Sequence, residues 1–441
     1  MAEFRWRPTP AAGNARRFDD VFFIDPQTGW SVNSNGFIAK TSNGGASWTI
    51  QHRAGAWMRC IGFADANHGW AGCTTATQRM FSTQNGENWA PVTNLPAQAP
   101  VKICGLSVVD RMTVYASGTN EPTDEPRMMK TTNGGETWTA WEMREWASIL
   151  IDTYFIDAER GWVVGGKTDD PEPQDRSEIK PVALFTEDGG RTWVDRLAGR
   201  EDEFPFGEWG WKIQFLNERL GFVSLENFSD AAILKTTDGG LTWRRIKVED
   251  PQNNANLEGI GFIDEKRGWV GGWGDPGFDS GHSSGTDDGG KTWHDADEIG
   301  LFINRFRFLG NPVTVGYASG STVFKYSDEP VVPSPAAAMA AAPALLPEAE
   351  LRMQEWPIRI PAAIPAGTAR ITLDIWDRFG NHIGTILDER RPRAGERTLE
   401  WDGYDSTGRR VSPGFFIARL TADDDAASTL LVPTATRDRS R

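Results

Sequence analysis

The octapeptide TTDGGLTW at Thr236–Trp243 is the clearest copy of a unit that recurs along most of the chain. Its pattern is Thr/Ser-x-Asp/Asn-x-Gly-x-x-Trp, and successive copies are 41 to 55 residues apart. The copies end at Trp48, Trp89, Trp138, Trp193, Trp243 and Trp293. In the second copy, STQNGENW, Gln84 stands where the others have Asp or Asn. Self-similarity at a period of this length indicates a repeat architecture.

A second pattern precedes each copy and consists of an apolar strand, a turn and a Gly-aromatic pair. Examples are VFFIDPQTGW at 21–30 and IGFIDEKRGW at 260–269, and a seventh version, FRFLGNPVTVGY, lies at 306–317. Each unit therefore predicts four short antiparallel strands, which is typical of one blade of a β-propeller. Seven first-strand motifs predict seven blades. The segment FRWRPT at 4–9 has no unit of its own and is predicted to be the outer strand of blade seven.

The chain changes character after the repeats. Residues 331–352 are rich in Ala and Pro and predict a linker. Residues 353–437 contain strand–turn–strand patterns such as TLDIWDRFGNHIGTI at 372–386 and predict a small Ig-like β-sandwich. The expected fold class is therefore all-β, with a seven-bladed β-propeller over 1–330, the linker, and the sandwich.

Two resemblances follow from these motifs. The TxDGGxTW unit resembles the Asp-box, or bacterial neuraminidase, repeat. Combined with the FxDxxxGW strand pair, it most resembles the photosystem II assembly/stability-factor family, which are single seven-bladed propellers. That resemblance implies a non-enzymatic assembly factor that binds partner polypeptides. The C-terminal stretch around WDGYDSTG at 401–408 resembles the Ig-like domain of flagellar hook-capping proteins.

The repeat residues are predicted to be structural. An Asp or Asn side chain can accept hydrogen bonds from backbone N–H groups of its own turn, and glycine permits positive φ. The tryptophan is expected to pack between neighbouring sheets. The residues in this predicted role are Asn43, Trp48, Asn133, Trp138, Asp188, Trp193, Asp238, Trp243, Asp288 and Trp293.

Binding is expected on the opposite face, where the loops are long, acidic and aromatic. Exposed aromatic rings beside carboxylates suit sugar rings or a polypeptide. The candidates are Trp57, Trp146, Asp169, Asp170, Phe206, Trp209, Trp211 and Trp273. The alternative is that these tryptophans cap the blades and the acidic residues only solvate the loops.

Composition excludes several function classes. The net charge of −15 argues against nucleic-acid binding. Three scattered cysteines, Cys60, Cys73 and Cys104, and five histidines predict no disulfide framework, metal site or cofactor. There is no apolar run long enough to span a membrane and no signal-peptide pattern, so a cytoplasmic or particle-associated protein is expected, or an extracytoplasmic one if the chain is a processed form.

The leading hypothesis is a non-catalytic binding or scaffolding protein. Its propeller loops would hold a partner polypeptide, and its Ig-like domain would dock it to a larger assembly or surface. The alternative is a carbohydrate-binding protein or glycosidase with sialidase-like architecture. The sequence has no GxSxG, P-loop or HExxH motif and no recognisable Tyr/Glu nucleophile pair, which favours the non-enzymatic interpretation.

Overall fold

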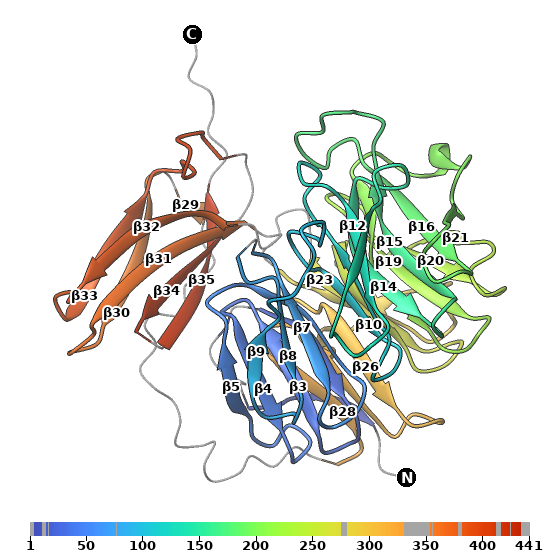
Figure 1. Ribbon diagram of the computed structural model, residues 1–441, viewed down its shortest axis with the longest axis horizontal. Coiled ribbons are helices and arrows are strands. Elements are labelled where there is room, and N and C mark those ends of the chain that lie inside the picture. Colours follow the sequence, from blue (N-terminus) through green and yellow to red (C-terminus); the bar gives the residue numbers. More distant parts are fainter. Residues whose placement is uncertain are drawn as a thin grey trace. The chain divides into compact units, whose positions relative to one another are not determined.

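The computed structural model describes residues 4–10, 15, 17–75, 77–274, 280–329, 353–354, 356–377, 382–411, 416–423 and 425–433. Strands dominate these residues, and the helical elements among them are the short 3₁₀ turns η1 (Glu201–Glu203) and η2 (Asp297–Ile299) (Figure 1). The chain forms two compact units. Strand β1 and residues 17–329 belong to the first, and the residues from 353 onward belong to the second. The predicted linker at 331–352 lies outside the described residues.

The first unit contains seven antiparallel four-stranded sheets, which we call blades one to seven. Blades one to three are β2 (Phe18–Phe23), β3 (Gly29–Asn33), β4 (Phe37–Thr41), β5 (Thr49–Arg53); β6 (Met58–Phe63), β7 (Gly69–Cys73), β8 (Met80–Thr83), β9 (Trp89–Pro91); and β10 (Gly105–Val108), β11 (Val114–Gly118), β12 (Arg127–Thr131), β13 (Thr139–Glu142). Blades four to six are β14 (Ile149–Phe155), β15 (Gly161–Lys167), β16 (Lys180–Thr186), β17 (Val194–Asp195); β18 (Glu208–Phe215), β19 (Gly221–Asn227), β20 (Ala232–Thr236), β21 (Arg244–Lys247); and β22 (Ala255–Phe262), β23 (Gly268–Gly274), β24 (Ser283–Thr286), β25 (His294–Asp295).

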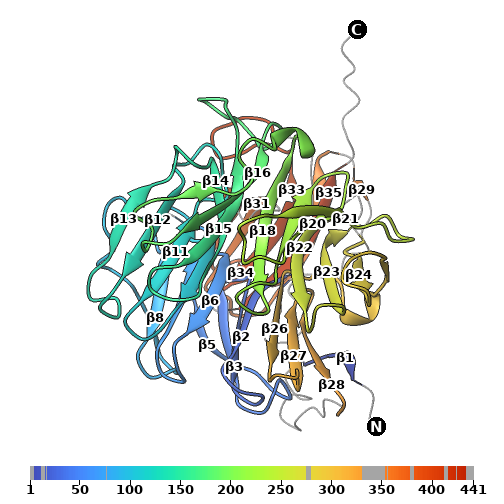
Figure 2. The ribbon, with the colours of Figure 1, turned by 90° about the vertical axis from the view of Figure 1, so that its right-hand side faces the viewer.

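Blade seven joins the two ends of the first unit. It consists of β26 (Arg305–Leu309), β27 (Val315–Ser319) and β28 (Val323–Ser327), with β1 (Arg5–Pro8) as its fourth strand. Strand β1 runs antiparallel to β28, pairing Arg5 with Ser327 and Pro8 with Phe324 (Figure 2). The segment at 4–9 therefore completes this sheet, as the sequence predicted.

The Phe and Gly-aromatic pairs of the repeat pack one blade against the next. In blade four, Phe155 covers Gly161 so closely that a Cβ on Gly161 would lie 2.4 Å from the phenyl ring. The other side of Phe155 stacks on Tyr115 of blade three, with ring centroids 3.5 Å apart. Phe222 of blade five and Phe262 of blade six repeat this stack at 3.7 Å. Glycine at this position is thus required by a close approach, and the following aromatic ring forms the contact between blades.

In blades one to six the turns of the repeated TxDGGxTW motif, called box turns here, are held by side-chain hydrogen bonds. Asp188 accepts bonds from the backbone N–H groups of Arg191 and Thr192 and from the Thr192 hydroxyl, at 2.7 to 2.9 Å. Thr186 also donates to Asp188, and Gly189 adopts a φ of 71°. The box tryptophans pack into clusters shared with the preceding blade, as Trp193 does between blades three and four. Buried box tryptophans are Trp89, Trp138, Trp193, Trp243 and Trp293, and Trp48 is partly buried.

The second box needs a correction to its predicted alignment. Asn85, not Gln84, occupies the position of the acidic residue. Its Oδ1 accepts from the backbone N–H groups of Glu87 and Asn88 at 3.0 and 2.9 Å, and Thr83 donates to it. The turn is one residue shorter than the others, so counting back from the tryptophan shifted the alignment by one position.

The box carboxylates are expected to stabilise the folded protein at neutral pH and to lose this effect in acid. The slight burial of Asp188 acts to raise its pKa, but the bonds from Thr192 and Thr186 outweigh it and lower the pKa to about 2. The pKa of Asp238 and that of Asp288 are lowered by equivalent bonds. These pKa values in the folded protein lie below the value of about 4 in the unfolded chain. The contribution of the three carboxylates to the free energy of unfolding is therefore complete above that pH and is lost as the pH falls through the lowered pKa values.

The triple variant Asp188→Asn, Asp238→Asn and Asp288→Asn should therefore lose less stability on acidification than the wild type. Asparagine already makes this turn at Asn43 and Asn133, so stability at neutral pH should change little. Thermal unfolding measured between neutral pH and pH values near 2 tests this. Parallel pH profiles for the two proteins would contradict the prediction.

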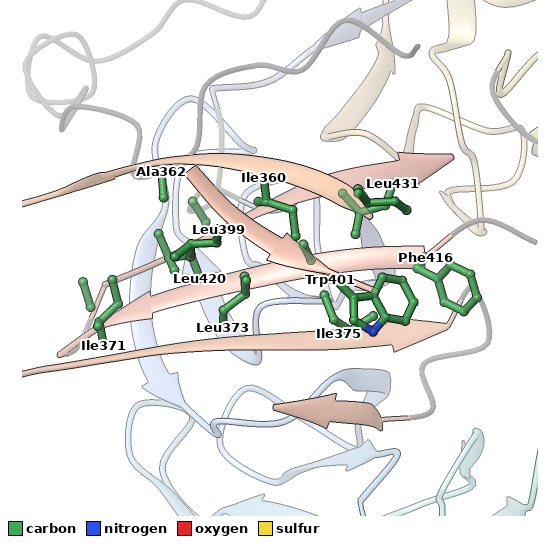
Figure 3. Packing of buried hydrophobic residues seen from close by; sticks show 14 of the residues in the cluster. Ile360, Ala362, Ile371, Leu373, Ile375, Leu399, Trp401, Phe416, Leu420 and Leu431 are labelled. Atoms are coloured by element: carbon green, nitrogen blue, oxygen red, sulfur yellow. The ribbon is translucent and has the colours of Figure 1, made fainter. Parts of the chain in front are cut away.

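The C-terminal unit packs two sheets around its own core (Figure 3). One sheet has the order β29-β35-β34-β31-β32 and the other pairs β30 with β33. The strands are β29 (Met353–Gln354), β30 (Ile358–Ile364), β31 (Arg370–Asp377), β32 (His382–Arg390), β33 (Gly395–Trp401), β34 (Phe416–Ala422) and β35 (Asp425–Pro433). Trp401 lies 4.8 Å from Phe416, and its Nε1 donates to the Tyr404 carbonyl. Asp405 accepts from the backbone N–H groups of Thr407 and Arg409, so WDGYDSTG contains a turn.

Candidate functional site

The structure separates the predicted binding residues into two groups. Trp146, Asp169, Asp170 and Phe206 line one pocket on blade four. The other four candidates are buried tryptophans. The members of that second group are Trp57, Trp209, Trp211 and Trp273.

The expectation that these four tryptophans are exposed is therefore corrected. Their relative exposure is 0 to 1 %, so no ligand at the surface can stack on them. Trp57 donates from Nε1 to Asp19 at 2.6 Å, and the guanidinium of Arg59 lies 4.8 Å above the Trp211 ring. Loop patterns in the sequence place these rings near the strand ends, but the neighbouring blades cover them.

The innermost strands also carry buried charged residues in four of the seven blades at one repeated position, which the sequence analysis missed. The position three residues before the repeated Phe is occupied, in blade order, by Asp20, Cys60, Gly105, Asp152, Lys212, Gly259 and Arg305. In several of these strands the register shifts next to this position, for example between Leu150 and Asp152. Such a bulge turns two successive side chains towards the same side. Aligning the seven copies would have revealed charged residues at a position where a buried strand normally has apolar ones.

Arg305 links three blades that are distant in sequence. Its Nη1 and Nη2 donate to both oxygens of Asp152 on β14 at 2.9 and 2.8 Å, and its Nε donates to Asp20 on β2 at 3.2 Å. Burial acts to raise the pKa of Asp152, but Arg305 and Lys212 outweigh it and keep that pKa low. The blade-seven strand is thus held to blades four and one by paired charges.

A second set of charges consists of Asp19, Arg59 and Glu258, which lie one residue earlier in the repeat, together with Arg17, which precedes β2. Asp19 accepts from Arg59 of blade two at 2.9 Å, while Arg17 pairs with Glu258 of blade six. All four side chains have at most 1 % exposure. Burial raises the pKa of Glu258, and the adjacent arginines oppose that effect. Because these charges neutralise one another within the protein, we assign them a structural role, which is to hold the blades of the first unit together.

The pocket on blade four has a volume of about 490 Å³. Trp146 and Glu145 enter it from the connection after blade three, Asp169 and Asp170 from the loop after β15, and Phe206 from the segment after η1. The ring of Phe206 is 67 % exposed. We call this cavity the acidic pocket.

The acidic pocket lies where the short outer strand of blade four leaves part of β16 uncovered by a paired strand. Strand β16 has seven residues, but β17 has two and pairs with Leu184 and Phe185. Lys180, Pro181 and Val182 therefore extend past the end of β17 and line the pocket. In blade five, by contrast, the four-residue β21 pairs along β20 as far as Ala232.

Carboxylates dominate the charge of the acidic pocket. Its six acidic residues, Glu145, Asp169, Asp170, Glu178, Asp195 and Glu201, face two lysines. The ammonium groups of those lysines donate to backbone carbonyls, Lys167 to Glu145 and Lys180 to Glu201, each at 2.8 Å. Burial raises the pKa of Asp195, opposed by hydrogen bonds from two backbone N–H groups. Within the described part of the chain, no group of three or more His, Cys, Asp or Glu side chains is arranged to hold a metal ion.

A second cavity of about 590 Å³ adjoins the acidic pocket at Trp146. It runs between the outer strand β13 and the box turn of blade four, and its walls include Trp141, Trp193 and Thr139. We call it the tryptophan groove. Its cations are already engaged: Lys130 donates to the Ala158 carbonyl at 3.1 Å, and Arg191 lies 3.9 Å from Glu159.

Comparison with known proteins gives a consistent picture of the first unit. The photosystem II assembly lipoprotein Ycf48 of Synechococcus sp. (strain CC9902) is 31% identical over 129 residues, which is 27% of this chain and 35% of that protein. A structure titled YCF48 bound to D1 peptide covers 74% of this chain and 96% of its own, with a TM-score of 0.51 and 16% identity. YCF48 from Cyanidioschyzon merolae covers 73% of this chain and 98% of its own, with a TM-score of 0.52 and 16% identity. The first unit is a β-propeller.

The propeller fold is shared with enzymes as well. The GH74 enzyme of Niastella koreensis has a TM-score of 0.51 at 11% identity, covering 96% of this chain and 73% of its own. Identities this low show the fold alone. This chain spans about a third of the length of the Ycf48 lipoprotein. No family model matches the chain, and none of the described helices is long and apolar enough to cross a membrane.

Proposed function

We propose that this protein is a non-catalytic assembly or scaffolding factor whose propeller binds a partner polypeptide. The proposal rests on the acidic pocket, where four of the residues predicted for binding meet in one cavity. Loops held by a rigid scaffold commonly carry binding sites, and an exposed aromatic ring beside charged groups is typical of protein interfaces. Phe206 and the carboxylates of Asp169 and Asp170 have this character.

The relatives support a polypeptide partner. The Ycf48 lipoprotein is named as an assembly protein of photosystem II, and one YCF48 structure contains a bound D1 peptide. We transfer only the class of partner, a polypeptide, to this chain. A glycan is the weaker candidate, since the four buried tryptophans offer no stacking surface.

We further propose that the C-terminal unit is an Ig-like domain that docks the propeller to a larger assembly. It has a core separate from those of the blades, formed by residues such as Ile360, Leu373 and Trp401. A separate core allows a domain to fold and bind by itself. The propeller would then hold the partner while this domain supplies attachment.

Affinity capture from the native source tests the proposed function. The full chain and a version ending at Glu329 serve as baits, with circular dichroism establishing that each is folded. We expect both baits to retain the same polypeptide, identified by cross-linking and mass spectrometry, and the full chain to retain further components of the assembly. Retention of polysaccharide without a discrete polypeptide would contradict the proposal and favour a glycan-binding protein.

A further inference from the structure

We propose that the acidic pocket and the tryptophan groove together bind one extended polypeptide segment. A lysine or arginine side chain of that segment occupies the pocket, and an apolar side chain occupies the groove. This inference rests on the proposed function and adds the chemistry of the partner.

The charge of the acidic pocket is complementary to a cation. Six carboxylates line the pocket against two lysines, which donate to backbone carbonyls and whose charges also act to lower the pKa of Glu201. A cationic side chain entering the pocket meets an excess of negative charge. Phe206 stands beside it with 67 % of its surface exposed and already carries Lys180 at 4.4 Å from its ring centroid. The large exposed surface of the ring leaves room for a further side chain to contact it.

The chemistry of the surface changes across Trp146. On the groove side the lining is three tryptophans, three threonines and two glycines, with Lys130, Arg191 and Glu142 as its charged residues. Trp146 belongs to both cavities and is packed against the core between blades three and four. A segment that crosses this ring thus meets an anionic site on one side and, on the other, a site with three tryptophan rings and no net negative charge. Rigid aromatic residues flanked by charged groups commonly dominate the binding energy of an interface.

The edge of β16 beside the acidic pocket has no paired strand. The short β17 leaves Lys180, Pro181 and Val182 along the pocket without the outer strand that blade five has at the same place. Because Pro181 lacks an N–H group, this edge is protected against pairing with any strand that happens to approach it. Side-chain recognition by the two cavities then determines which segment binds.

Peptide binding to the full chain tests the proposal. The probes are fluorescein-labelled, acetylated and amidated peptide libraries that carry fixed arginine and leucine positions at varied spacing. A matched library has citrulline in place of arginine, which keeps the shape and removes the charge. A third library has serine in place of leucine. Fluorescence anisotropy gives the affinity of each.

We expect the arginine–leucine library to bind at least about tenfold more tightly than either matched library, with affinity falling as salt is raised. The double variant Asp169→Asn with Asp170→Asn should weaken binding about tenfold, and Phe206→Ala about fivefold or more. The control is Asp295→Asn with Glu298→Gln, which removes two exposed carboxylates, one in β25, the outer strand of blade six, and one in the η2 turn that follows it. It should stay within about twofold of the wild type, since exposed charges away from the site contribute little.

The groove is tested by Thr139→Lys, which places a charged side chain on its exposed wall and leaves the packed tryptophans in place. This variant should bind the arginine–leucine and arginine–serine libraries equally. Equal binding of the arginine and citrulline libraries by the wild type would overturn the proposal, as would absence of binding. The proposal would also be overturned if the control variant, Asp295→Asn with Glu298→Gln, weakened binding as much as Asp169→Asn with Asp170→Asn.

The two proposals fail in different ways. If the Asp169→Asn, Asp170→Asn variant still captures the native polypeptide at wild-type level, the propeller is a binding protein and the assignment of this site is wrong. If the wild-type chain captures no polypeptide, the proposed function itself fails.

Discussion

Replacing Arg305 by methionine is expected to lower the free energy of unfolding of the propeller by about 3–5 kcal/mol. The guanidinium bridges Asp152 and Asp20 on two other blades, and its side chain is 8 % exposed while those of the carboxylates are 1 and 2 % exposed. Removing the cation leaves two buried carboxylates without their partner. Such groups lose solvation on folding, and Lys212 beside Asp152 and the backbone N–H groups that donate to both carboxylates offset that loss only in part.

Urea unfolding monitored by circular dichroism, with the propeller transition fitted separately, measures this change. The matched control is Arg160→Met, which removes an arginine from the exposed pair with Asp157. That control should cost at most about 1 kcal/mol, because exposed ion pairs contribute little. The double variant Arg305→Met with Asp152→Leu should recover part of the loss, since one buried charge is then removed. Equal effects of Arg305→Met and Arg160→Met would contradict the assignment.

Replacing Trp6 by alanine is expected to destabilise the propeller by about 3–5 kcal/mol, as for other large buried aromatic residues. Trp6 is 6 % exposed on β1 and packs against Trp269, Phe306 and Tyr326, with ring centroids 5.5, 5.6 and 5.2 Å away. Strand β1 is the element that joins the N-terminal segment to blade seven. Loss of the Trp6 side chain should therefore weaken the attachment of β1 and open the closed circle of blades at blade seven.

Hydrogen exchange should show this opening directly. In Trp6→Ala, amides of β28 that bond to β1 should exchange faster than those of blades three and four. Trp146→Ala is the control, because that ring is only partly buried and lies on a loop. A loss of stability no larger than that of the control, or faster exchange spread evenly over all blades, would contradict the role assigned to β1.

Much of the architecture is local in origin and was therefore predictable. The box turn needs an acceptor such as Asp188, glycines at positive φ and a tryptophan within eight residues, so a single copy already defines the turn. The pair of strands β14 and β15 needs glycine at position 161, where the Phe155 ring packs against the backbone, and this contact lies within one hairpin. Repetition of such units predicted an all-β repeat protein with β1 completing the last sheet.

The candidate site was predictable only in part. The sequence placed Trp146, Asp169, Asp170 and Phe206 on loops of blades three and four, and the structure brings them into one pocket. It could not show that Trp211 is covered, because burial depends on neighbouring blades.

What the sequence by itself determined is the repeating unit, since turns and hairpins depend on residues close together in the chain. What only the tertiary structure decided is which side chains meet across the ring. Arg305 and Asp152 are 153 positions apart, and their contact depends on the number of blades between them and on the bulge that turns Asp152 inward. The acidic pocket likewise depends on where β17 ends relative to β16, a difference of a few residues in pairing that no local pattern records.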